Sequence, residues 1–475
     1  MLEAFFAAVD ITNLPQEILT ANPSISSAVA DDGIDDVAAI QAVVDWLTAQ
    51  RQAGFTDEST IYFPAGVFDL SKTVEVDTSA ISFEGAGIGR TILRNTDAFH
   101  VGTTGLPDSG VDLKSVNQNA YLFSLKRNAD GVAFANVTLI GPGVHGAIFG
   151  YGVDELEIGH VEFDNFAWSA VRLFNVSRAN IHHNVFIDAG GQAQGTSGVT
   201  GGAIYATFLK DSEIHHNTIS KSGEREGNVY GIKGRKFNNT HLHHNTIATS
   251  FAIELPFESD RFVEIERNYL DGAISIPKFG GGAVPQDGFT FHIHHNYFTR
   301  SYSLEWARNG AEVDHNVFVF DTESDGGNLI SNFGSELAAG PTKFHNNLIL
   351  NPGRGIFWSR GVYNNFSFYN NVVTANETST PRTEGLFAFN SSTDFSTIEL
   401  RDNIVEVNGA SRPLMRNDAS YSAVIENNTL KNVSDIDQFD NPDTGSQRGL
   451  TAPLVFKVGA NEEFVVDGFN LRKLQ

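Results

Sequence analysis

The stretch "EIHHNTI" at residues 213–219 is repeated along the chain, and its repetition decides the fold. Close copies are "NIHHNVF" at 180–186, "HLHHNTI" at 241–247 and "HIHHNYF" at 292–298. Their asparagine belongs to a longer series with the pattern apolar-x-x-Asn-x-apolar: Asn184, Asn217, Asn245, Asn268, Asn296, Asn316, Asn347, Asn371, Asn403 and Asn428. Neighbours in this series are 20 to 33 residues apart (316 minus 296, 217 minus 184). Self-similarity at such a period is typical of a solenoid.

The repeating units have the pattern of strands. Apolar residues alternate over short spans, as in "AIYATF" (203–208), and upstream Val137 and Val161 take the asparagine position. A helical solenoid needs two amphipathic helices in about 34–47 residues, whereas these units are shorter and interrupted by Gly, Asn and Asp. We therefore predict an all-β fold, a single-domain right-handed parallel β-helix of about a dozen coils whose strands stack about 4.8 Å apart.

The two ends of the chain differ from the coils. The segment "DDVAAIQAVVDWLTAQRQAG" at 35–54 has helical apolar spacing, acidic residues in its first turn and a glycine at its end. Such a helix would cover the open end of the stack. We expect one domain over 1–475, with an N-terminal segment and capping helix at 1–60, coils at 61–450 and a C-terminal cap at 451–475.

Composition limits the partners. Lys+Arg 32 against Asp+Glu 57 gives a net charge of -25, which disfavours nucleic acid and anionic membranes as partners. Cysteine is absent, which excludes disulfides and thiolate metal sites. The chain has no apolar run of membrane-spanning length, and its start "MLEAFFAAVD" does not resemble a signal peptide. We expect a secreted or periplasmic monomer in mature form, although a cytoplasmic protein fits as well.

A column of residues one position after each inward-facing Ile or Val is predicted to face solvent. It contains Phe149, Arg172, Tyr205, Lys233, Glu254, Ser275 and Glu305, and two residues further along the same face follow Tyr151, Thr207 and Arg235. Glycine-rich insertions at 189–202 and 220–231 would bound a cleft suited to an extended polymer. Arginine and lysine at its centre favour a carboxylate or sulfate ligand. Alternatively, Lys233 only neutralises Glu254.

Several segments carry a family resemblance. The N-terminal helix, "IYFPAG" (61–66), "FEGAGIGRTIL" (83–93) and the asparagine series resemble the pectate-lyase-like β-helix superfamily, which includes polysaccharide lyases, mannuronan C5-epimerases and several glycoside hydrolases. The Tyr205 and Lys233 pair on adjacent coils is similar to the lysine and tyrosine of alginate lyases of polysaccharide lyase family 31. The resemblance implies a lyase that acts on a uronate polymer, with alginate as the first candidate.

The chemistry expected of these residues is β-elimination. Arg172 and Arg235 would neutralise the uronate carboxylate, while Lys233 acts as base and Tyr205 as acid, or the reverse. Tyr151, Glu254 and Glu305 complete the predicted substrate-binding set. No metal ligand and no cofactor is expected for the reaction, and the acidic run "DDGIDD" at 31–36 leaves room for a structural calcium ion.

Three other functions remain open. A C5-epimerase would also remove the C5 proton. An inverting glycoside hydrolase would use Glu254 and Glu305, which are predicted two coils and so about 9.6 Å apart. A non-enzymatic carbohydrate-binding β-helix would rely on aromatic platforms, for which Tyr151, Trp168, Trp306 and Trp358 are candidates. The histidine pairs are interpreted as structural, because equivalent positions elsewhere hold other residues, such as Glu266 and Arg267.

Overall fold

The computed structural model forms two compact units, Met1–Thr240 and His241–Gln475, and each is described by itself. Side chains are not described for residues 261, 276, 304–306, 328, 331, 332, 359, 389, 415–417, 423, 434 and beyond 434. The structure describes residues 8–99, 113, 116–191, 201–223, 229–255, 261–276, 291–299, 304–306, 311–320, 328–332, 342–352, 355–359, 366–376, 385–389, 398–417, 423–434, 454–458, 462–467 and 470–474.

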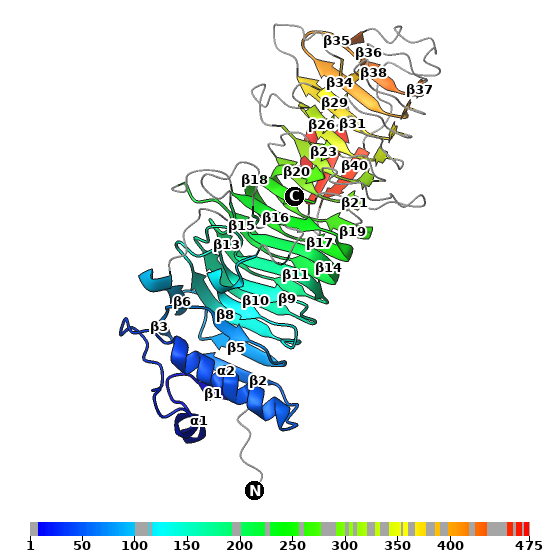
Figure 1. Cartoon of the computed structure of the whole chain (residues 1–475). Coiled ribbons are helices and arrows are strands. Elements are labelled where there is room, and N and C mark those ends of the chain that lie inside the picture. The colour runs from blue at the N-terminus through cyan, green and yellow to red at the C-terminus, as the bar shows by residue number, and fades with distance from the viewer. Residues whose placement is uncertain are drawn as a thin grey trace. The chain divides into compact units, whose positions relative to one another are not determined.

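The first unit starts with one short strand and two helices and continues with stacked parallel strands (Figure 1). Its elements are β1 (Ala8–Asp10), α1 (Gln16–Ala21), α2 (Val37–Gln52), β2 (Ser59–Phe63), β3 (Gly66–Leu70), β4 (Val74–Val76), β5 (Ile81–Gly85), β6 (Thr91–Asn95), β7 (Tyr121–Leu125), β8 (Ala133–Ile140), β9 (Gly146–Tyr151), β10 (Glu157–Asp164), β11 (Val171–Ser177), β12 (Asn180–His182), β13 (Val185–Ile187), β14 (Ile204–His215), β15 (Thr218–Ser220) and β16 (Tyr230–Arg235). Strand β17 (Asn238–His243) runs across the boundary between the units.

The second unit also consists of short parallel strands up to its C-terminal region. These are β18 (Thr246–Glu254), β19 (Arg261–Glu266), β20 (Tyr269–Ile276), β21 (Phe291–His294), β22 (Tyr297–Thr299), β23 (Leu304–Trp306), β24 (Ala311–Asp314), β25 (Val317–Val319), β26 (Asn328–Asn332), β27 (Thr342–His345), β28 (Leu348–Leu350), β29 (Gly355–Ser359), β30 (Phe366–Tyr369), β31 (Val372–Asn376), β32 (Phe387–Phe389), β33 (Ile398–Arg401), β34 (Ile404–Asn408), β35 (Arg412–Pro413), β36 (Met415–Asn417), β37 (Ala423–Glu426), β38 (Thr429–Lys431) and β39 (Val433–Ser434).

The C-terminal strands differ from the coils. Strands β40 (Leu454–Val458), β41 (Glu462–Asp467) and β42 (Asn470–Leu474) form an antiparallel sheet of their own. The segment 451–475 therefore does not add another parallel coil, and its role as a cap remains a prediction. No helix in the described ranges is long and apolar enough to cross a membrane.

Helix α2 forms where the sequence predicts it. Its Gln41 side chain donates to Glu75 O and accepts from Glu75 N on β4, both at 2.9 Å, which ties the helix to the strand edge. Arg51 donates to the carbonyl oxygens of Ser79 and Ala80. The helix buries Ile40, among other apolar residues, and its role as a cap of the stack remains a prediction.

The acidic run at 31–36 fastens the chain to β3. Backbone N–H groups of β3 and the residue after it donate to Asp31 at 3.0 Å, Asp36 at 3.0 Å and Asp35 at 2.9 Å. These carboxylates thus satisfy donors along a strand edge. A structural calcium ion at this run stays a prediction, and it would have to compete with these hydrogen bonds.

The asparagine ladder is confirmed within each unit. In the first unit, Asn184 Oδ1 accepts from Val161 N at 2.9 Å, and Asn217 Oδ1 accepts from Asn184 N at 3.1 Å and from Asn184 Nδ2 at 3.0 Å. In the second unit the same pattern runs without a break through Asn245, Asn268, Asn296, Asn316, Asn347, Asn371, Asn403 and Asn428. Each amide is buried and bridges two coils, so its donors and acceptors are satisfied inside the stack.

The residue before each asparagine has a left-handed backbone. This position has φ between 53° and 57° at His183, His216, His244, Arg267, His295, His315, Asn346, Asn370, Asp402 and Asn427, and the same holds for Asn136 and His160 before Val137 and Val161. Asn, Asp and His are enriched in this conformation among non-glycine residues. The second histidine of "HHN" is therefore explained by the bend.

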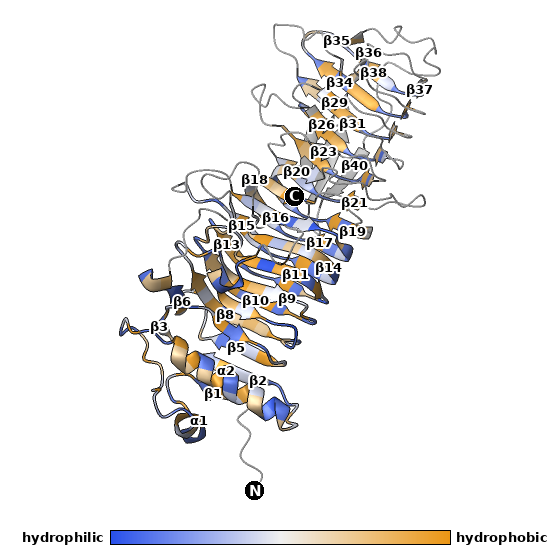
Figure 2. Cartoon of the chain, in the orientation of Figure 1, coloured by the Kyte–Doolittle hydropathy of each residue, from blue (hydrophilic) through white to orange (hydrophobic). Residues whose placement is uncertain are grey.

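The interior is filled by stacked apolar side chains. Hydrophobic and hydrophilic residues alternate along the strands of the first unit, as Figure 2 shows. Phenylalanines stack from coil to coil, with ring centroids 4.6 Å apart for Phe163 and Phe186 and 4.5 Å for Phe298 and Phe318. Ile214 and Ile219 of the opening stretch are both buried, as predicted.

Candidate functional site

The predicted column of the first unit is confirmed in register. Arg172 pairs with Phe149 on one side and with Tyr205 on the other, and Tyr205 pairs with Lys233. The neighbouring column also aligns, since Tyr151 pairs with Phe174. Counting residues from the asparagines was therefore sufficient to place these side chains on adjacent coils.

The prediction that this column faces solvent is wrong. Arg172 is 0% exposed, Tyr205 2% and Lys233 6%. Other parts of the chain cover the face. Ala120 and Tyr121 form a buried cluster with Phe149, and Val116 packs against this cluster. Gly202 lies so close to Lys233 that an added Cβ would be 2.9 Å from the lysine Cβ.

Arg172 uses its guanidinium group within the protein. Nη1 donates to Leu173 O at 2.6 Å and to Tyr205 O at 3.3 Å, and Nη2 donates to Thr207 Oγ1 at 3.2 Å. Because the buried guanidinium donates hydrogen bonds to two acceptors on the next coil, it stabilises the packing of the two coils. This geometry corrects the expectation that Arg172 offers its charge to a ligand from an open surface.

The ring of Tyr205 lies beside two cations. The guanidinium carbon of Arg172 is 4.1 Å from its centroid, and Lys233 Nζ is 5.6 Å from it. Lys233 Nζ also lies 5.9 Å from the centroid of Tyr230. We call Arg172, Tyr205, Tyr230 and Lys233 the buried cluster. Cation–π contacts at these distances are favourable, and more so when desolvated.

A line of aromatic rings follows the buried cluster on the same strands. Tyr151 and Phe174 have ring centroids 6.0 Å apart, and Phe174 and Phe208 have centroids 5.6 Å apart. Arg127 lies over Tyr151 at 4.8 Å and Lys236 lies over Phe208 at 4.4 Å. We call these five residues the aromatic strip. It has three rings on successive coils and a cation at each end.

Phe208 is held in an unfavourable conformation. Its φ is 58°, which is rare for a bulky residue, and its side chain is 37% exposed. Backbone strain of this kind clusters at functional sites. The residue equivalent to Phe208 on the preceding coil is Asn175, with φ of 54°. The equivalent residue on the following coil is Lys236, with φ of 58°.

Sequence reasoning missed most of the aromatic strip. It selected Tyr151 as substrate-binding but not Arg127, Phe174, Phe208 or Lys236. Phe208 and Lys236 lie at bends, where the alternation of inward and outward residues breaks. The adjacent residues Arg235 and Lys236 are half-buried. The signal available in the sequence was an aromatic residue at one position of two consecutive coils, Tyr151 and Phe174, and at the next position of the third coil, Phe208.

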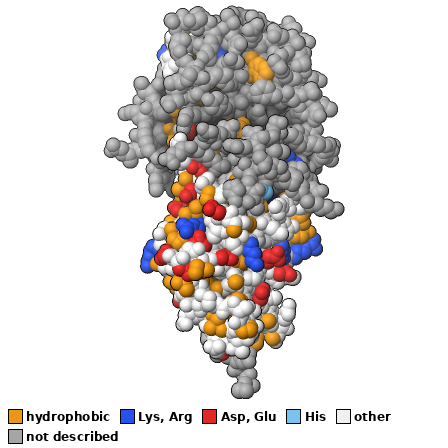
Figure 3. Space-filling model, turned by 60° about the vertical axis from the view of Figure 1, so that its left-hand side comes forward, with side chains coloured by type: hydrophobic (Ala, Val, Ile, Leu, Met, Phe, Trp, Pro, Cys, Tyr) orange, Lys and Arg blue, Asp and Glu red, His pale blue; other side chains and the backbone are white. Residues whose placement is uncertain are grey.

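The mixed charge of the surface is visible in the first unit. On the face drawn in Figure 3, Lys and Arg side chains lie next to Asp and Glu side chains. Arg178 forms ion pairs with Asp154 and Glu155 in this way. In the aromatic strip, Arg127 and Lys236 also lie over aromatic rings.

The two candidate hydrolase carboxylates belong to the second unit. Glu254 pairs with Ser275, and Ser275 pairs with Glu305, so the two residues are two strands apart as predicted. Glu254 is half-buried. The side chain of Glu305 lies outside the described residues, as does that of Trp306, whereas Trp168 is fully buried and no platform.

The histidine pairs form hydrogen bonds within their own bends. His182 Nδ1 and His183 Nδ1 are 2.9 Å apart, and the ring of His183 stacks on His216 with centroids 4.8 Å apart. Asn346 donates to His345 Nδ1 at 3.0 Å at the equivalent bend, so histidine is not required there. Three described clusters nevertheless bring enough donor atoms together within one unit for a metal ion: His160 with His182 and His183, Glu264 with His292 and His294, and His241 with Glu264 and Glu266.

Comparisons with known proteins support the fold. The family described as "Right handed beta helix region" matches residues 146–318. The tailspike protein of E. coli bacteriophage HK620, solved as a mutant in complex with a hexasaccharide, is similar over 97% of this chain and 84% of its own, at 12% identity and a TM-score of 0.59. The surface adhesin PfbA of Streptococcus pneumoniae is similar over 98% of both chains, at 11% identity and a TM-score of 0.47.

A search of curated proteins finds no match. The parallel strand pairing defines the class of fold, a parallel β-helix, and residues 146–318 match the right-handed family of that fold. At these identities the similarity to the tailspike concerns the fold alone.

Proposed function

We propose that the protein binds an acidic polysaccharide along the aromatic strip and cleaves it by β-elimination at the buried cluster. The observation that carries the proposal is the aromatic strip itself, three rings on successive coils between Arg127 and Lys236. Phe208 is exposed and Tyr151 is half-buried, whereas Phe174 between them is buried, so Phe208 and Tyr151 are the rings that can pack against the apolar faces of sugar rings. Cations at both ends suit a polymer with carboxylates. A solenoid repeats such contacts at each coil, which fits an extended chain.

Lys233 and Tyr205 are the proposed catalytic residues. Lys233 would act as base in its neutral form, not as the cation described above, and its amine would then accept the C5 proton of a uronate. The electron pair left at C5 forms the C4–C5 double bond, the C4–O4 bond breaks, and the Tyr205 hydroxyl protonates O4. The reverse assignment satisfies the same balance. Arg172 acts as a positioning residue, since it binds the Tyr205 backbone and contacts its ring.

The remaining predicted residues have supporting roles in this proposal. Arg235, two residues after Lys233 on β16, is the candidate for neutralising the uronate carboxylate. Tyr151 contributes one ring of the aromatic strip. Alginate is the first polymer to test. The reaction as written needs no cofactor. A polymer substrate of this kind suits a secreted or periplasmic protein. The fold also occurs in a phage tailspike solved with an oligosaccharide, which supports a carbohydrate partner.

The test is a panel of alginate, pectate and glycosaminoglycans with the full chain. We expect ultraviolet absorbance from the unsaturated product on one polymer, lost in Lys233→Ala and Tyr205→Phe. New reducing ends without that absorbance would instead indicate the hydrolase with Glu254 and Glu305. Exchange of the C5 proton without cleavage would indicate an epimerase, and saturable binding without either reaction would leave a carbohydrate-binding β-helix.

A further inference from the structure

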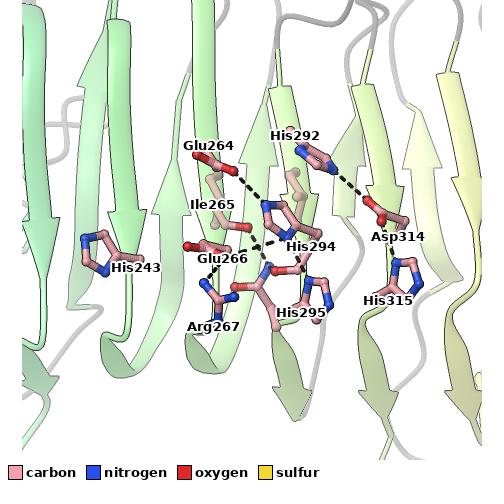
Figure 4. A network of polar contacts seen from close by, with 12 residues as sticks. His243, Glu264, Ile265, Glu266, Arg267, His292, His294, His295, Asp314 and His315 are labelled. Carbon is pink, nitrogen blue, oxygen red and sulfur yellow. Dashed lines mark hydrogen bonds and ion pairs between the residues drawn. The ribbon is translucent and has the colours of Figure 1, made fainter. Parts of the chain in front are cut away.

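A group of imidazoles and carboxylates lies on one face of the second unit, over β19, β21 and β24 (Figure 4). Glu264 pairs in register with His292, and His294 follows two residues later on the same face. Donor atoms of Glu264, His292 and His294 all lie within 4.8 Å of one another. The side chains of Glu264 and His292 are 45% and 41% exposed, whereas that of His294 is 11% exposed.

The outer nitrogens of both imidazoles are already held by neighbours. His292 Nε2 is 2.7 Å from Asp314 Oδ1, and the other ring nitrogen of His292 lies on the side of Glu264 (Figure 4). His294 Nδ1 is 2.8 Å from His295 Nδ1, and its Nε2 faces Glu264 Oε1 at 2.9 Å. Metal-binding histidines are oriented in this way, with one nitrogen held by a carboxylate or another partner and the other left for the ion.

We propose that Glu264, His292 and His294 bind a divalent transition-metal ion of the zinc class. Two imidazole nitrogens and one carboxylate oxygen are a common donor set for Zn²⁺, Co²⁺ or Ni²⁺. The ion replaces the proton shared by Glu264 and His294, and the exposed side of the site leaves a position for water. Asp314 and His295 orient the two histidines from behind.

The fold itself does not require these three residues. Glu264 and His292 occupy equivalent positions on neighbouring coils. On the next three coils, the residues at this position are Glu312, Lys343 and Ser367. Lysine and serine there cannot hold an ion of this class, so the coils form without ligands. Serine at this position on another coil also shows that the substitution His292→Ser is compatible with the fold.

A bound ion would connect neighbouring coils. Glu264 lies on β19 and both histidines lie on β21, while Asp314 on β24 supports His292. Binding to the folded chain stabilises it by mass action. The site therefore gives two independent readouts, metal affinity and thermal stability, and neither depends on polysaccharide cleavage.

The experiment uses the full chain, stripped with EDTA and titrated with Co²⁺ for its ligand-field absorption and with Zn²⁺ against a chromophoric chelator. Glu264→Gln and His292→Ser should each weaken binding at least on the order of 100-fold, and Asp314→Asn by roughly 10–100-fold. Zn²⁺ should raise the melting temperature of the wild type and not that of His292→Ser. Unchanged melting in EDTA identifies variants that fold normally.

The variant that separates this site from the cluster of His160, His182 and His183 in the first unit is His183→Asn, which removes one donor of that cluster at a bend where asparagine occurs elsewhere. It should leave the Co²⁺ spectrum unchanged. Equal affinity in the wild type, Glu264→Gln and His292→Ser would overturn the proposal. Loss of the signal in His183→Asn alone would do the same, because it would assign binding to the histidine pairs of the first unit.

Discussion

The guanidinium carbon of Arg172 lies 4.1 Å from the centroid of the Tyr205 ring on the next coil, and both side chains are buried. The same guanidinium donates to the Tyr205 carbonyl oxygen. Arg172 thus holds both the backbone and the ring of the proposed acid. A charge in this position is tolerated because its donors reach acceptors on two coils.

Replacement of Arg172 by methionine should therefore destabilise the protein. Leu173 O, Tyr205 O and Thr207 Oγ1 would each lose a charged donor, and a hydrogen bond to a charged group contributes about 1.5–3 kcal/mol. Urea unfolding measures this loss. The control is Arg178→Met, whose exposed ion pairs should contribute no more than about 1 kcal/mol. Equal stability of the two variants would contradict the supporting role of Arg172.

The asparagine ladder gives a second stability prediction. Asn316→Ala removes the acceptor of Asn296 N and the donor to Ile293 O, and both groups are buried. We expect a loss of about 2–5 kcal/mol in the free energy of unfolding. Asn408→Ala, which removes only an exposed amide contact with Asn376, should stay within about 0.5 kcal/mol of the wild type. A small effect of Asn316→Ala would show that water replaces the amide.

The ladder was predictable because its cause is local. A buried amide that bridges coils recurs at each bend, so the sequence carries one asparagine per coil and the register follows by counting. Whether a strand face is open depends on segments remote in sequence. Ala120 and Tyr121 form a buried cluster with Phe149, and Gly202 lies against Lys233. The alternation around Phe149 and Lys233 therefore could not predict that they are buried.

The aromatic strip and the metal cluster were missed for a related reason. Phe208 lies at a bend with positive φ, where alternation assigns no face. His294 was interpreted as a member of a structural histidine pair and His292 was not selected, although Glu264 on the preceding strand makes the two a possible site. Such constellations arise from the register between coils and the direction of each side chain, which spacing alone does not give.

The bend before each asparagine can be tested at His183. Its φ of 54° disfavours a β-branched residue, so His183→Val should cost on the order of 1–2 kcal/mol relative to His183→Asn. Both variants remove the same imidazole stack, so their difference reports the backbone alone. Chemical unfolding of the pair measures it. Equal stability would mean that the bend relaxes to another conformation.

The buried carboxyl of Asp36 predicts a dependence of stability on pH. Burial raises its pKa to about 6 from 3.8, against the backbone N–H groups of Asp69 and Val29, which favour the charged form. The folded state therefore binds a proton that the unfolded state has released between these two values. The contribution of Asp36 to stability falls as pH rises from about 4 to about 6 and is constant above about 7.

Urea unfolding of the wild type and Asp36→Asn across this range isolates the contribution of Asp36. The variant should gain stability relative to the wild type as pH rises through the window, because the amide does not ionise. A difference that is independent of pH would place the titration elsewhere.

The aromatic strip makes the most direct prediction about binding. Phe208→Asn removes one ring at a bend where the preceding coil already has Asn175 with a similar φ, so the backbone should be relieved and stability unchanged or higher. Affinity for the acidic polysaccharide should nevertheless fall on the order of tenfold, as measured by calorimetry with an uncleaved oligosaccharide. Lys236→Gln should weaken binding in a salt-dependent way, since it removes one cation. Tyr269→Ala changes an exposed aromatic of the second unit and is the control. If Phe208→Asn binds as tightly as the wild type while Tyr269→Ala does not, the polymer contacts the second unit and the aromatic strip is not its binding site.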